Sequence, residues 1–136
     1  MAFYGFADGA CHHTLNLASA ACVIYSLAYN LVSSGAVCIG PATNNIAEYQ
    51  AVIGLLTEAT SEDVCNLVVL MDSQLVVCHL NHVYTIRNPM LLRLFRRVCL
   101  LERSFEAITC RHIPREDNAV TDSMANYILD WHFSHS

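Results

Sequence analysis

The chain has 136 residues, of which 54% are hydrophobic and 14% charged, and its formal net charge at pH 7 is −5. This length and apolar content predict one folded domain over residues 1–136 and exclude a disordered chain. The sequence has no run of about 18 apolar residues, and its start lacks a basic stretch followed by an apolar one. We therefore expect no transmembrane helix, no signal peptide, no membrane partner and an intracellular location, in the cytoplasm or nucleus.

Three strands are predicted in the first 40 residues. Phe3–Ala10 ends beside an Asp-Gly pair, and Ser19–Ser26 is rich in β-branched and small apolar residues. Tyr29–Ile39 follows after a tight connection and stops at a Gly-Pro pair. The short connections predict an antiparallel meander.

Helices and strands alternate in the rest of the chain. We expect a helix capped within Thr43–Asn45 that runs to about Thr60, then a strand at Leu67–Met71. A short helix capped by Ser73 runs to Leu80, and a helix with an apolar stripe runs from Pro89 to Leu101. A strand at Glu106–Ile113, a loop at Pro114–Asp117 and a helix from Asn118 to about Leu129 complete the chain. The order β-β-β-α-β-α-α-β-α predicts an α/β fold, a mixed sheet with helices packed on it.

Cysteine and histidine give little indication of a zinc site. The seven cysteines are odd in number, and no two have the C-x-x-C spacing of close zinc-ligand pairs. We interpret them as small buried apolar side chains. The His12-His13 pair has no partner pair at metal-ligand spacing, so we interpret it as part of a solvated loop.

Charge is distributed unevenly along the chain. There is no lysine, all seven arginines lie between Arg87 and Arg115, and the first 86 residues carry six carboxylates and no arginine. An anionic region beside a cationic one suits a metal-binding centre next to a phosphate-binding flank. A solvated helix face over Arg93–Arg103 explains the arginines equally well, so charge alone leaves both interpretations open.

Four carboxylates stand at the ends of predicted elements. Asp8 closes the first strand and Asp72 the apolar strand, while Glu48 and Asp122 lie near the starts of two helices. Sites in open α/β sheets form outside the carboxyl ends of strands, where these side chains would converge. Four anions share a pocket only with bound cations, and oxygen-only ligands favour Mg²⁺ or Mn²⁺. Two such ions about 4 Å apart would clamp an attacking water and a leaving oxygen in phosphodiester hydrolysis.

Four segments together resemble the ribonuclease H family, most of all its archaeal-type and retroelement-type branch. They are "DGA" from Asp8, "TNNIAEYQAVIGLL" from Thr43, "VVLMDSQLVV" from Val68 and "HIPREDNAVTDSMAN" from His112. The resemblance implies an RNase H-like mixed five-stranded sheet, with three antiparallel strands followed by parallel strands and helices on both faces. It also implies a ribonuclease H activity: endonucleolytic, two-metal hydrolysis of the RNA strand of RNA–DNA hybrids, with Mg²⁺ or Mn²⁺ and 5′-phosphate products.

The same resemblance assigns site residues by position. The metal-binding catalytic set is Asp8, Glu48, Asp72 and Asp122, and His112 lies near where relatives place a mobile histidine that helps to activate water or release product. The expected substrate contacts are Gly9 and Ala10 beside the RNA strand, Asn44, Asn45 and Gln74 at the minor groove, and Arg115 at a phosphate or the transition state. The family's Asn-x-x-x-Asp spacing selects Asp122 over Asp117, which we interpret as a loop or cap residue.

Two departures from the family pattern stand out. The stretch "CHHTLNLASAA" after the first strand lacks the family's frequent glycine-rich turn, so hybrid binding there is expected to differ. Only "NHVYTIRN" separates two helical segments, so the chain lacks the basic protrusion of some relatives. We expect low affinity for free hybrid, partly restored by Arg93, Arg96 and Arg97.

Other classes fit less well. Proofreading-type exonucleases carry D-x-E on the first strand, and integrases end their triad in Glu, whereas this chain has Asp8-Gly9-Ala10 and Asp122. The alternative that stays open is a catalytically idle RNase H-like nucleic-acid-binding or structural module of a retroelement polyprotein. Similar domains occur free and beside a reverse transcriptase. The apolar composition and the lack of lysine hint at a neighbouring domain or a dimer, and the oligomeric state is left open.

Overall fold

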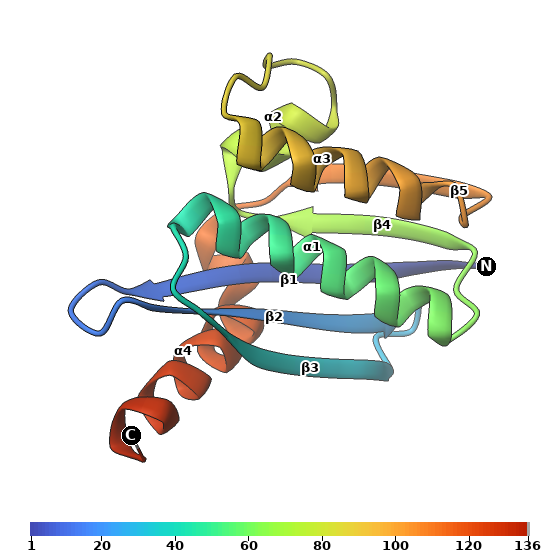
Figure 1. Ribbon diagram of the computed structural model, residues 1–136. Coiled ribbons are helices and arrows are strands. Elements are labelled where there is room, and N and C mark those ends of the chain that lie inside the picture. The colour runs from blue at the N-terminus through green and yellow to red at the C-terminus, as the bar shows by residue number, and fades with distance from the viewer. Residues whose placement is uncertain (136) are drawn as a thin grey trace.

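The computed structural model describes residues 1–135 and is built on a five-stranded sheet in the order β3-β2-β1-β4-β5 (Figure 1). The strands are β1 (Ala2–His12), β2 (Leu17–Ser26), β3 (Leu31–Gly40), β4 (Asn66–Met71) and β5 (Ala107–His112). The first three are antiparallel, while β4 pairs parallel with both β1 and β5. The predicted α/β fold, with antiparallel strands followed by parallel ones, is confirmed.

Helices cover both faces of this sheet, as expected (Figure 1). The helical elements are α1 (Asn44–Ser61), α2 (Gln74–Leu80), α3 (Pro89–Glu102), the 3₁₀ turn η1 (Arg115–Asn118) and α4 (Ala119–Ser134). On one face α1 packs against β1, β2 and α3, and on the other face α4 packs against β1, β2 and β3. None of the helices in residues 1–135 combines the length and apolarity that crossing a membrane requires.

The hydrophobic core lies mainly between the sheet and α1. Seven consecutive residues of β2, Ala18–Ile24, are buried because helices cover the strand on both sides. On α1 the fully buried side chains include Tyr49, Leu55 and Leu56. The apolar stripe of α3, with Leu91, Leu94 and Val98 buried, closes the same core from outside.

Several predicted boundaries shift for local reasons. Strand β3 begins at Leu31 and not Tyr29, because Tyr29 has a φ of 59° in the turn that precedes it. The predicted loop Pro114–Asp117 is largely the 3₁₀ turn η1. Helix α4 continues past Leu129 to Ser134. The predicted caps Thr43 and Ser73 both accept a backbone N–H, from Ile46 and Val76 respectively.

The connection between β1 and β2 turns without glycine. Asn16 takes a φ of 51°, a left-handed conformation that asparagine tolerates better than most residues. The ring of His12 accepts the N–H of Leu15 through Nδ1 (3.3 Å) and stacks on Phe133 of α4. Within residues 1–135, neither His12 nor His13 joins a group of side chains that could hold a metal. All seven cysteines are free thiols.

Gly9 allows α1 to lie directly on β1. A Cβ at this position would come within 2.4 Å of the backbone carbon of Ala47 and 2.5 Å of the nitrogen of Glu48. Atoms at that separation overlap, and neither partner is the end of a flexible side chain. The first turn of α1 is therefore pressed against the strand only because position 9 has no side chain.

Gly9→Ala is expected to lower the free energy of unfolding by about 1–3 kcal/mol, because α1 must move away from β1. The measurement is denaturant unfolding followed by circular dichroism. Gly54→Ala is the matched control: Gly54 lies on the same helix, and a Cβ there would meet nothing within 4 Å. In this control the free energy of unfolding should rise by about 0.5–1 kcal/mol, because alanine has a better helix propensity than glycine. Equal effects of the two substitutions would contradict the steric argument.

Candidate active site

Asp8 and Asp72 are brought side by side by the parallel pairing of β1 with β4. The last paired residues of the two strands are Phe6 and Leu70. Each aspartate lies two residues further along the chain. Asp72 follows the end of β4, whereas β1 continues beside β2 to His12, so the prediction that Asp8 closes the first strand is wrong. Successive side chains in a strand point to opposite faces, so residues two apart share a face. The predicted convergence of these two carboxylates follows from this register.

Glu48 enters from α1 and is fixed by the strand beneath it. The backbone N–H of Gly9 donates to Glu48 Oε1 at 2.8 Å. Glu48 is 8% exposed and Asp8 is 3% exposed. The close approach that Gly9 permits therefore both buries Glu48 and orients it over β1.

Asp8, Glu48 and Asp72 form a cluster in which one oxygen of each carboxylate lies within 4.8 Å of the others. Asp8 Oδ2 and Glu48 Oε2 are buried, and neither has a hydrogen-bond partner in the described part of the chain. Burial raises the pKa of Asp8 well above its ordinary value, and the charges of Glu48 and Asp72 raise it further. Burial also raises the pKa of Glu48, against the lowering effect of the Gly9 hydrogen bond.

Such a cluster fits hard divalent cations. Buried carboxylate oxygens without partners are costly, and a bound cation would supply the missing interactions. The donor set is oxygen only, which suits Mg²⁺ or Mn²⁺ better than zinc or copper.

Asn118 holds the cluster from the side of α4. It is 1% exposed, and its Nδ2 donates to the carbonyl of Ala7 and to Asp72 Oδ1, both at 3.1 Å. One amide thus ties the middle of β1 to the carboxylate that follows β4. In the sequence, Asn118 served only to select Asp122. Its bridging role joins residues 111 and 46 positions apart, which local spacing does not reveal.

Asp122 lies outside the three-carboxylate cluster but within the same pocket. Its Oδ1 is 3.7 Å from the guanidinium of Arg115, which is 77% exposed. Asn126, one helical turn on, donates to Asp122 Oδ1 at 3.3 Å. The negative charge of Asp122 also contributes to the raised pKa of Glu48. Asn126 was not predicted as a site residue, although its i+4 spacing from Asp122 places it on the same helix face.

The pocket around these carboxylates has a volume of about 340 Å³ and gathers most of the predicted residues. Its lining residues are Asp8, Gly9, Ala10, Cys11, Asn44, Asn45, Glu48, Asp72, Ser73, Arg115, Asp122 and Asn126. The lining thus includes all four predicted carboxylates. Asn44 and Asn45 reach it from the first turn of α1, and Arg115 from η1.

Two predicted residues lie outside the pocket lining. Gln74 is exposed at the first position of α2, directly after the pocket residue Ser73. His112 is exposed at the end of β5 and pairs with Met71, the residue before Asp72. Both lie at the same sheet edge as the carboxylates. Asp117 does not line the pocket, which agrees with the choice of Asp122.

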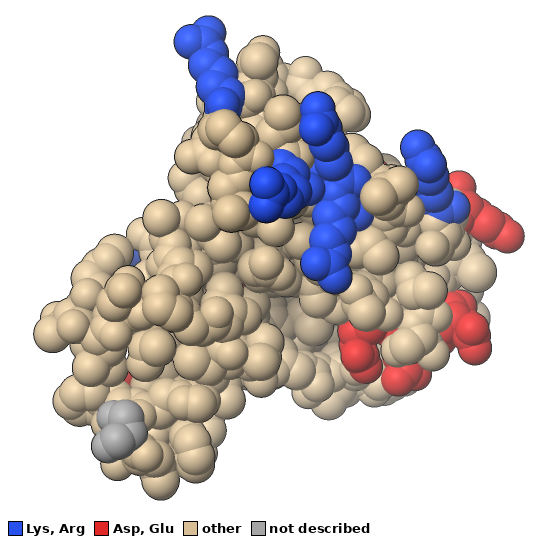
Figure 2. Space-filling view, in the orientation of Figure 1, with Lys and Arg blue, Asp and Glu red and all other residues tan. Residues whose placement is uncertain are grey.

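Positive charge is concentrated away from the carboxylates. Figure 2 shows arginines gathered over α3, while the acidic side chains visible on that face lie near the end of α1 and, at the right edge of the view, beside an arginine. Arg93, Arg96 and Arg97 are all exposed there. The uneven charge seen in the sequence is therefore a separation in space, with an arginine cluster (Arg93, Arg96 and Arg97) on one helix.

The chain is similar in sequence to known proteins. A family model described as "Reverse transcriptase-like" matches residues 6–128. The bifunctional protein Rv2228c of Mycobacterium tuberculosis is 37% identical over 92 residues, which are 68% of this chain and 25% of that protein. This chain therefore spans about a quarter of the length of that relative.

Two solved structures cover nearly the whole chain. RNase H1 of the archaeon Halobacterium salinarum has a TM-score of 0.92 at 32% identity, over 96% of this chain and 98% of that one. LC11-RNase H1, solved in complex with an RNA/DNA hybrid, has a TM-score of 0.89 at 28% identity, over 96% of this chain and 99% of that one.

The raised pKa of Asp8 makes the stability of the metal-free protein depend on pH. Above the ordinary carboxyl pKa the unfolded chain has released the proton that the folded protein still holds, so stability falls as pH rises. Asp8→Asn removes this penalty. Without metal, the gain over wild type in unfolding free energy should grow by at least about 1 kcal/mol between pH 5 and pH 8.

The measurement is denaturant unfolding in EDTA across that pH range. Asp130→Asn, which changes an exposed carboxylate on α4, is the control and should show no such growth. A gain from Asp8→Asn that is constant with pH would contradict the crowding of the carboxylates.

Proposed function

Because this chain belongs to the ribonuclease H family, we propose that it is an endoribonuclease that hydrolyses the RNA strand of RNA–DNA hybrids. The observation that carries the proposal is the cluster of Asp8, Glu48 and Asp72, with two buried oxygens that lack partners. The likeness to LC11-RNase H1, which was solved with a hybrid, supports the choice of substrate.

Divalent cations are the proposed cofactor, with Mg²⁺ or Mn²⁺ as the ions and two ions as the number. Asp8, Glu48 and Asp72 would hold them, and Asp122 would complete the set from α4. Bound cations would supply stabilisation of the negative charge that develops on the attacking and leaving oxygens. The contribution of the protein is to keep the carboxylates converged and oriented, while bound cations would favour their ionised form.

Substrate contacts are proposed around the same pocket. Asn44 and Asn45 present amides that can both donate and accept, which suits 2′-hydroxyls and base edges in the minor groove. Gln74 is exposed beside them and can extend this contact. Arg115 can leave its long contact with Asp122 to face a phosphate, because both side chains are reachable from solvent. His112, exposed at the end of β5, is the proposed mobile group for water activation or product release.

We also propose that this domain works beside a second domain. The bifunctional mycobacterial relative is about four times as long as the matched segment, and the matching family model is described as "Reverse transcriptase-like". Both support a domain that works beside another one, with a reverse transcriptase as the proposed neighbour. An intracellular location stays a prediction.

Asp72→Asn tests the mechanism. The substitution should lower the cleavage rate of a labelled hybrid by more than about 100-fold, because it removes a charged metal ligand. The fold should be retained or stabilised, since carboxylate repulsion is relieved and position 72 can still accept from Asn118. Asp117→Asn, an exposed acid outside the pocket, should keep wild-type activity. Full activity of Asp72→Asn would refute the mechanism.

The substrate class is tested with the same gel assay. Hybrid, double-stranded RNA and double-stranded DNA are incubated with Mg²⁺, with Mn²⁺ and with EDTA. We expect cleavage of the RNA strand of the hybrid in either metal, with 5′-phosphate ends. No cleavage by the folded wild-type domain would favour the idle-module alternative.

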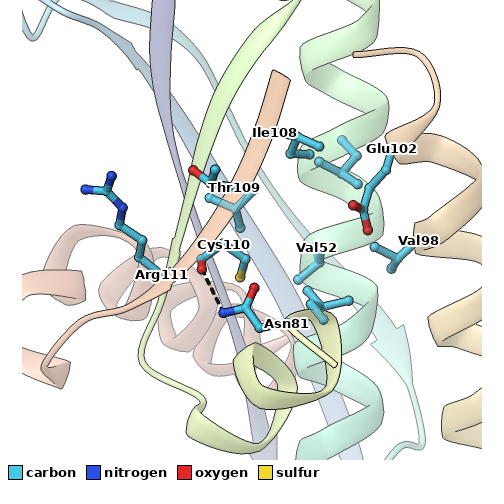
Figure 3. A pocket seen from close by; sticks show the side chains of 11 residues that line it. Val52, Asn81, Val98, Glu102, Ile108, Thr109, Cys110 and Arg111 are labelled. Atoms are coloured by element: carbon cyan, nitrogen blue, oxygen red, sulfur yellow. Dashed lines mark hydrogen bonds between the residues drawn. The ribbon is translucent and has the colours of Figure 1, made fainter. Parts of the chain in front are cut away.

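The arginine cluster on α3 is proposed to contact the hybrid backbone. Replacing Arg93, Arg96 and Arg97 together by Gln should raise KM and lower the slope of log K against log salt by about 2 to 3, because each phosphate contact releases counterions. Arg111→Gln is the control, since Arg111 points away from the α3 side of the sheet (Figure 3). An unchanged salt slope in the triple variant would assign these arginines to a solvated helix face.

A further inference from the structure

A buried hydrogen bond joins α1 to α2 close to the carboxylate cluster. Tyr49 Oη and His79 Nδ1 are 2.7 Å apart, and their rings stack with centroids 6.0 Å apart. Tyr49 is 0% exposed and His79 is 5% exposed. Burial raises the pKa of Tyr49 and lowers that of His79, because it penalises the charged form of each side chain. The tautomer of the imidazole determines which of the two atoms donates.

Each partner of this bond lies on a segment that leads directly from a ligand of the proposed metal site, and His79 follows Asp72 by seven residues. Tyr49 directly follows Glu48 on α1. His79 is on α2, which begins at Gln74, two residues after Asp72. A hydrogen bond between these two helices thus links the backbone that carries Glu48 to the backbone that carries Asp72.

Helix α2 needs such an anchor because it is short and incompletely packed. It has seven residues, and its end borders a cavity of about 340 Å³ between α1, α3, β4 and β5 (Figure 3). Leu80 and Asn81 line that cavity. On this side α2 borders the cavity and is not tightly packed against other side chains.

Few directional contacts fix the orientation of α2. Val76 and Val77 are buried, but apolar contacts alone do not set a rotation. Asn81 donates through Nδ2 to the carbonyl of Cys110 at 3.0 Å, which ties the end of the helix to β5 (Figure 3). Among the described residues, the bond between His79 and Tyr49 is the one side-chain hydrogen bond that joins α2 directly to α1.

We propose that Tyr49 and His79 form a positioning pair that sets α2 against α1 and thereby the separation of the Glu48 and Asp72 carboxylates. This inference rests on the proposed function, because the role of the separation is to hold the catalytic cations. The pair touches neither substrate nor cation, and it acts through the backbone of the two ligands.

The test compares variants that keep the packing and remove the bond. Tyr49→Phe deletes the hydroxyl while keeping the ring, and His79→Leu deletes the ring nitrogen that is its partner. His79→Asn retains an oxygen or nitrogen near the position of Nδ1 and is the rescuing variant. Ser33→Ala is the matched control: it deletes the 2.6 Å bond from Ser33 to Glu58, which joins β3 to the far end of α1.

Four quantities are measured for each protein: the Mn²⁺ affinity by calorimetry, kcat and KM on the hybrid, and the thermal midpoint. We expect Tyr49→Phe and His79→Leu to weaken Mn²⁺ binding about tenfold and to lower kcat with little change in KM. His79→Asn should stay within about threefold of wild type. Ser33→Ala should lower the thermal midpoint without changing Mn²⁺ affinity.

Each outcome has a separate meaning. If Tyr49→Phe and His79→Leu lose thermal stability but bind Mn²⁺ as wild type does, the pair is merely structural and the inference is wrong. If only His79→Leu weakens metal binding and Tyr49→Phe does not, the hydrogen bond is not the cause, and the inference is again wrong. If the wild-type protein itself binds no Mn²⁺, the proposed function fails before the variants are compared.

Discussion

Repulsion among three carboxylates is the constraint around which this end of the molecule is built. Asp8, Glu48 and Asp72 lie close together, and two of their oxygens are buried without partners. In the metal-free protein this arrangement costs stability, so the surrounding structure must hold it in place. The bonds from Gly9 and Asn118 do so by giving Glu48 and Asp72 fixed donors. A site of this kind gives up stability in exchange for a preorganised charge.

The supports are unequal on the two sides of the pocket. Asp8 and Glu48 are buried and held by the sheet and by the backbone contact at Gly9. Asp72 and Asp122 are partly exposed, and each accepts a side-chain hydrogen bond from an asparagine. The buried carboxylates of Asp8 and Glu48 are therefore held more firmly than the partly exposed carboxylates of Asp72 and Asp122. Adjustment at Asp72 passes through α2, the shortest α-helix of the described chain, which is why its anchorage to α1 bears on the chemistry.

Local rules account for much of the site, and long-range contacts account for what they miss. The convergence of Asp8 and Asp72 follows from the parallel register of β1 and β4, although β1 itself continues past Asp8 to His12. The caps at Thr43 and Ser73 were predictable from short-range preference. The bridging amide of Asn118 was not, because it depends on how distant segments meet.

Gly9 shows the same limit. The resemblance placed Gly9 beside the RNA strand, which stays a prediction, and Gly9 lines the pocket. What the sequence did not reveal is that the backbone of α1 also lies against this glycine.

The distribution of charge raises a separate question, because a chain with net charge −5 is proposed to bind a polyanion. Net charge governs long-range steering, but a Debye length near 8 Å screens distant charges, so the local field decides once surfaces meet. The arginine cluster on α3 would attract the phosphates of the hybrid. The carboxylates of the pocket would repel them until bound cations neutralise the carboxylate charge. Cation binding would then serve affinity as well as chemistry.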